Sequence, residues 1–105
     1  MIDGAVNLYL ATAGILAAGL EGIQQQLDPG QRIDENLFAR GDEFTNLQTL
    51  PHNLYEAMAA LKQDALLMEM MGELGAKTFL EMKAKEWNAF NAQITTWEMD
   101  QYVNI

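Results

Sequence analysis

The strongest helical pattern in the chain is the stretch AKTFLEMKAKEWNAFNAQITTW, residues 76–97. Its apolar and aromatic side chains recur at alternating steps of four and three, which is the spacing of one face of an α-helix. We therefore predict a single helix from about Ala76 to Tyr102, roughly 40 Å long at 1.5 Å per residue, as the longest element. The stripe consists of Ala76, Leu80, Lys83, Trp87, Phe90, Ile94 and Trp97, with only Lys83 not apolar.

A second helix is predicted near the start of the chain, over residues 8–26. Asn7 is a favourable N-cap residue, and Asp28-Pro29-Gly30 is a turn sequence that ends the helix. Each glycine inside this helix costs about 0.8–1.0 kcal/mol relative to alanine, so we expect another backbone to approach it closely. Its apolar stripe consists of Leu8, Thr12, Ile15, Leu16, Gly19 and Ile23.

Two shorter helices are predicted between these. Asn53 and Glu56 have the spacing of a capping box before a helix over residues 54–63, and Asp64 can cap a further helix that Gly72 and Gly75 end. Residues 31–50 are expected to form an irregular loop with one helical turn, pinned to the core by isolated apolar residues. These are Ile33, Leu37, Phe38, Phe44 and Leu47.

No run of β-branched residues alternates with period two for long enough to predict a strand. We therefore predict an all-α fold: a compact array of three to four helices with a long C-terminal helix and one irregular pinned loop. Residues 1–105 are expected to form a single helical domain, since this length is typical of one domain.

The composition excludes several classes of protein. Half of the residues are hydrophobic and a fifth are charged, which is typical of a globular chain. The formal net charge of −9 repels phosphate backbones and anionic lipids, so we expect neither nucleic acid nor membrane as a partner. Residues 5–20 are apolar but too short and too rich in Ala and Gly for a membrane span. The absence of cysteine suits a reducing cytoplasm.

Nothing in the sequence has the pattern of a complete active site. His52 is the only histidine, and we expect it to be a loop or surface residue beside Pro51. The acidic residues are dispersed, without the spacing of a calcium loop or a di-metal bundle, and the glycines form no phosphate-binding motif. We therefore predict no catalytic, cofactor-binding or metal-binding residues in this chain.

Two blocks of the first predicted helix resemble a family signature. Residues 7–11, Asn-Leu-Tyr-Leu-Ala, and residues 17–23, Ala-Ala-Gly-Leu-Glu-Gly-Ile, resemble the Asn-Pro-Tyr-Leu-Ala and Ala-Ala-Gly-Leu-Asp-Gly-Ile segments near the C-terminal end of glutamine synthetases. Leu8 replaces the usual proline and Glu21 the usual aspartate. The resemblance continues through residues 27–30, 33–38 and 50–57, and residues 83–102 are similar to the closing helix of glutamine-synthetase-like ligases.

The resemblance implies the C-terminal helical part of a cytoplasmic ligase. Such an enzyme phosphorylates the γ-carboxylate of glutamate with ATP and lets ammonia or an amine displace the phosphate. It uses magnesium or manganese and assembles in stacked rings. The family's catalytic residues lie upstream, in a sheet domain, so we expect this chain to be inactive alone, to be part of a longer ligase, and to cover that domain and contact other subunits.

The surface that would face the sheet domain is expected to be apolar, because the first helix has small or apolar residues almost all round. We predict packing or interface roles in homo-oligomer contacts for Ala11, Gly14, Ala18, Trp87, Phe90 and Trp97. An alternative that needs no family is a free-standing acidic helical domain whose aromatic stripe binds a partner helix.

Overall fold

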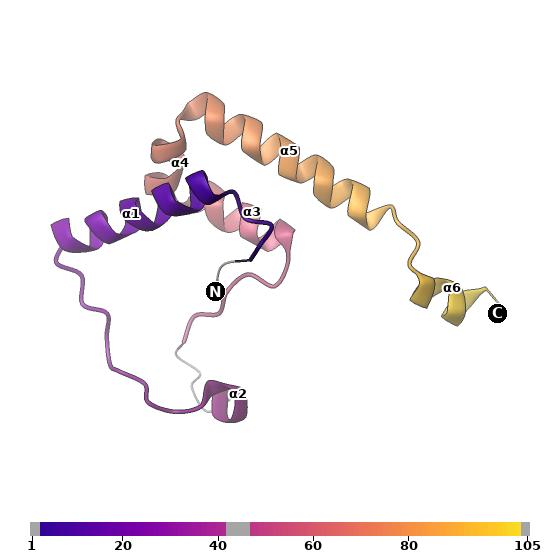
Figure 1. Ribbon diagram of the computed structural model, residues 1–105, viewed down its shortest axis with the longest axis horizontal. Coiled ribbons are helices and arrows are strands. Elements are labelled where there is room, and N and C mark those ends of the chain that lie inside the picture. The colour runs from indigo at the N-terminus through magenta and orange to yellow at the C-terminus, as the bar shows by residue number, and fades with distance from the viewer. Residues whose placement is uncertain (1–2, 42–46, 104–105) are drawn as a thin grey trace. The chain divides into compact units, whose positions relative to one another are not determined.

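The computed structural model describes residues 3–41 and 47–103, and every regular element in these ranges is an α-helix (Figure 1). The prediction of an all-α fold is confirmed. Six helices are present in the described ranges: the four predicted helices, the helical turn predicted within residues 31–50, and a short helix over residues 96–102 that the structure separates from the long one. The chain divides into unit 1, residues 1–51, and unit 2, residues 52–105, each described below by itself.

Unit 1 begins with helix α1, Leu8–Gln24, which ends two residues before the predicted boundary. The side chain of Asn7 caps it by accepting hydrogen bonds from the backbone N–H groups of Tyr9 and Leu10, at 3.1 and 3.2 Å. After the helix, the side chain of Asp28 accepts from the N–H of Gly30 at 2.8 Å. Gly30 has a φ of 84°, which glycine adopts without strain, so the predicted turn is confirmed.

After α1, the described residues of unit 1 form an irregular segment that contains one helical turn, α2, Leu37–Arg40, as predicted. Asn36 caps this turn through a 3.1 Å hydrogen bond from the N–H of Phe38. Phe38 itself is fully exposed, so it does not anchor the loop within this chain, whereas Ile33 is half-buried. The predicted anchor Phe44 lies outside the described residues.

Unit 2 contains the helices α3, Leu54–Gln63, α4, Ala65–Met71, and α5, Glu73–Asn91, which pack on one another. Met58 of α3 and Ala76 of α5 are buried, at 8% and 1% exposure. As predicted, Asn53 caps α3 and Asp64 caps α4, through hydrogen bonds of 2.8 and 3.0 Å. The small core of the described chain therefore lies among these three helices.

The boundaries of the predicted long helix were wrong at both ends. Helix α5 starts at Glu73, ends at Asn91 and is the longest described element, but a second helix, α6, Thr96–Tyr102, follows it after a break. Gly75 lies inside α5 and does not end a helix, while Gly72, with a φ of 76°, separates α4 from α5. The break has a local cause: Thr95 and Glu98 form a capping box, which starts the new helix α6.

Candidate interface surfaces

Two faces of α1 differ in the size of their side chains. The predicted small-residue face, Ala11, Gly14 and Ala18, lies on one side of the helix at the expected spacing. Ala11 and Gly14 are half-buried, and Ala18 is exposed. At 3.6 residues per turn, the larger side chains of Leu8, Thr12 and Leu16 centre on a different side of the helix, although Leu8 and Ala11, three residues apart, are neighbours.

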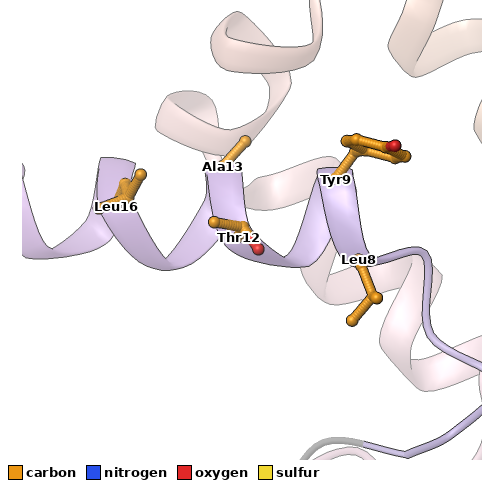
Figure 2. Close-up of a pocket in the computed structure, with 5 residues that line it drawn as sticks. All are labelled: Leu8, Tyr9, Thr12, Ala13 and Leu16. Carbon is orange, nitrogen blue, oxygen red and sulfur yellow. The ribbon is translucent and has the colours of Figure 1, made fainter.

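The larger face of α1 forms an open apolar surface (Figure 2). Leu16 is 62% exposed, and the side chains of Leu8 and Tyr9 are also exposed. The sequence pattern identified Leu8 and Leu16 as part of an apolar stripe, but the structure leaves this stripe largely uncovered. The residues that line the surface are Leu8, Tyr9, Thr12, Ala13 and Leu16.

Two of the three predicted aromatic interface residues belong to a cluster in unit 2. The ring of Trp87 on α5 lies between Tyr55 of α3 and Phe90 of α5, with centroids 6.2 and 6.5 Å apart. Trp87 is half-buried, so much of its surface is already used inside the unit. Phe90 is 66% exposed and presents the open edge of this cluster.

Trp97 does not continue that cluster, because it lies on α6 beyond the break in the helix. Its ring packs edge-on against Tyr102, with centroids 6.0 Å apart, and it remains 63% exposed. Over the described part of unit 2, α6 does not pack on α3, α4 or α5. The predicted single stripe is therefore two separate aromatic surfaces. The Thr-Thr-Trp-Glu sequence at residues 95–98 was the signal that could have revealed the break.

Some charged side chains of the described residues form ion pairs with near neighbours. Arg32 contacts Asp34 at 2.7 Å, and Lys83 contacts Glu86 at 2.8 Å. Such exposed pairs contribute about 0–1 kcal/mol each. The residues that the structure describes contain no group of three or more His, Cys, Asp or Glu placed to hold a metal ion.

Glu98 has a perturbed carboxyl group. The backbone N–H of Thr95 donates to it at 2.7 Å, and the Thr95 hydroxyl donates to the same oxygen at 2.9 Å. These hydrogen bonds favour the charged form and hold the pKa of Glu98 below its ordinary value of 4.5. The perturbation therefore belongs to the capping box of α6, where the carboxylate supports the start of a helix.

His52 lies in the exposed segment before α3, as predicted. Its backbone N–H donates to the carboxylate of Glu56 at 2.9 Å. The reciprocal bond of the predicted capping box is thus made one residue before Asn53. His52 therefore takes part in the start of α3 through its backbone N–H.

In the ranges that the structure describes, no helix is both long and apolar enough to cross a membrane. Apolar and aromatic side chains are exposed on α1, α5 and α6, and some charged side chains, such as those of Arg32 and Lys83, pair with near neighbours.

Comparison with known proteins gives these surfaces a context. The family model of the glutamine synthetase catalytic domain matches residues 1–102. A glutamine synthetase from Rhizobium leguminosarum bv. phaseoli is 43% identical over 98% of this chain and 24% of its own length. A glutamate–methylamine ligase from Methyloversatilis universalis is 34% identical over 96% of this chain and 23% of its own length.

The fold agrees with a solved structure, "Apo GmaS without ligand". That structure matches with a TM-score of 0.86 and 41% identity, over 98% of this chain and 24% of the solved chain. The present chain thus spans about a quarter of the length of the relatives it matches. It belongs to the glutamine synthetase family and corresponds to a C-terminal part of such a ligase.

Proposed function

We propose that this chain is the C-terminal structural part of a ligase that uses ATP to join ammonia or an amine to the γ-carboxylate of glutamate. The observation that carries the proposal is the family match over residues 1–102, together with the share of only 24% of a relative's length. In this proposal residues 1–105 act as one helical part of the larger enzyme, which works in the cytoplasm. The absence of cysteine is compatible with that compartment.

The chemistry of the reaction is assigned to the rest of the enzyme. Phosphoryl transfer needs metal ions and cationic groups that converge on the transferred phosphate. In the described chain, Arg32 and Lys83 instead face neighbouring carboxylates at the surface. We therefore propose that ATP and magnesium or manganese bind to residues outside this chain. The acceptor is left as ammonia or an amine, because the relatives include both glutamine synthetases and a glutamate–methylamine ligase.

The contribution of this chain to the ligase is proposed to be packing. Leu8, Leu16 and Leu20 of α1 are exposed, and covering a Leu side chain stabilises a contact by about 1.5–3 kcal/mol. A folded chain gains by covering such a surface with apolar partner residues. We propose that the catalytic domain of the same enzyme covers this face of α1.

Complementation of a truncated relative tests this assignment. The Rhizobium leguminosarum glutamine synthetase, with the segment homologous to this chain removed, is mixed with this chain and assayed for ATP-dependent glutamine formation. We expect neither piece to be active alone and the mixture to be active. The excised segment of the relative is the positive control. Activity of this chain alone would overturn the placement of the catalytic groups.

A pair of variants makes the complementation specific to α1. Leu16→Asp places a charge in the proposed contact and should lower the restored activity at least about tenfold, which corresponds to about 1.4 kcal/mol of association energy. Gln24→Asp adds the same charge at an exposed polar position of α1 and should leave the activity unchanged. Equal effects of the two changes would show that the apolar face of α1 is not the contact.

Contacts between copies are the second part of the proposal. Ala11, Gly14 and Ala18 on α1 are proposed as one surface for homo-oligomer contacts. Trp87, Phe90 and Trp97 are proposed as contributors to others, with Trp87 acting mainly through its packing beside Phe90. The exposure of Phe90 and Trp97 supports this assignment.

Sedimentation equilibrium of the chain at tens of micromolar tests these contacts. We expect self-association that weakens when a charge replaces an exposed aromatic residue, as in Phe90→Lys. Gln101→Lys, at an exposed polar position of α6, is the matched control and should not change the association. A monomer at all concentrations would contradict the proposed contacts between copies.

A further inference from the structure

We draw no further inference here: the strongest candidate, the exposed apolar surface of α1 that Leu8, Tyr9 and Leu16 line (Figure 2), belongs to the contact with the rest of the ligase already proposed, and nothing in the structure points to a second occupant.

Discussion

Units 1 and 2 begin their helices with the same local device but differ in what those helices bury. Asn7 caps α1 and Asn53 caps α3, each through a side-chain oxygen that accepts backbone N–H groups. In unit 2 the helices that follow enclose Met58 and Ala76. Helix α1 has 17 residues and none of them is buried. Capping therefore decides where a helix starts, whereas burial depends on which partners the chain itself supplies.

This difference has a consequence for stability. Most helical stability in proteins comes from packing of an apolar face, and helices shorter than about 12–15 residues are marginal alone in water. Helix α1 is only slightly longer and contains Gly14, Gly19 and Gly22, each of which weakens it by about 0.8–1.0 kcal/mol relative to alanine. We expect α1 to open more readily than α3–α5 in the isolated chain.

The largest effect is expected from Met58→Ala. Truncation of a buried methionine typically lowers the free energy of unfolding by about 2–5 kcal/mol, through lost burial and the cavity left behind. Denaturant unfolding can be followed by the fluorescence of Trp87, which lies beside Tyr55 at the contact of α3 and α5. A Trp97→Phe background makes Trp87 the sole tryptophan.

Met82→Ala is the matched control for this change. Met82 lies on α5 but is 61% exposed, and surface substitutions usually change stability by less than about 0.5 kcal/mol. If both variants lowered the unfolding midpoint equally, Met58 would not belong to a core in solution. The contrast between unit 2 and unit 1 would then be lost.

A smaller effect is expected from removing the two caps. Asn-to-Ala at an N-cap typically costs about 0.5–2 kcal/mol. Asn53→Ala should lower the Trp87 unfolding midpoint, because α3 is part of the packed unit. Asn7→Ala should reduce the helical circular dichroism signal of α1 while leaving the Trp87 midpoint in place.

The comparison of these two variants shows whether the units unfold independently. Asn88→Ala, at an exposed position within α5, is the control for loss of an Asn side chain away from a cap. An equal shift of the Trp87 midpoint by Asn7→Ala and Asn53→Ala would mean that α1 and α3–α5 unfold as one cooperative unit. The proposed difference in stability would then be wrong.

The same division between local and long-range effects decides how much the sequence could predict. The caps Asn7, Asn53 and Asp64 and the turn at Asp28-Pro29-Gly30 were all predicted correctly, because each involves residues within three positions of one another. The all-α fold followed from the helical periodicity. Such features depend on short stretches of chain, which a single sequence displays in full.

The errors arose where periodicity competed with a capping signal. The stripe through Trp87, Phe90 and Trp97 favoured one long helix, but Thr95 and Glu98 satisfy each other's polar groups and start a new one. The apolar stripe of α1 indicated a face that needs a partner, and the sequence analysis expected that partner in a domain outside this chain. Periodicity alone cannot show whether the partner of a helix lies within the same chain.

Helix α6 sharpens the comparison as a third case, a helix with a strong cap and no packing on α3, α4 or α5 in the described unit. The smallest predicted effect is its response to acid. The Glu98 carboxylate accepts the backbone N–H and the hydroxyl of Thr95, so the pKa of Glu98 is lower in the folded helix than its ordinary value of 4.5. Its contribution to stability is therefore complete above pH 4.5 and is lost as the pH falls through the lowered pKa.

We expect acid to fray α6 before α3–α5 unfold, because the capping box is the only device described at the start of α6 and it depends on a charge. The fluorescence of Trp97 in a Trp87→Phe background follows α6, and the amide signals of Thr95 and Glu98 locate the change. Glu98→Gln is the matched control, because glutamine can occupy this place in a capping box but has no charge to lose. The acid-dependent part of the α6 signal should be smaller in Glu98→Gln than in the parent chain, and the Trp87 signal should be the same in matched Trp97→Phe backgrounds with and without this change. An identical acid response of Trp97 with glutamate or glutamine at position 98 would show that the cap does not hold α6, and that this helix depends on a partner in the way proposed for α1.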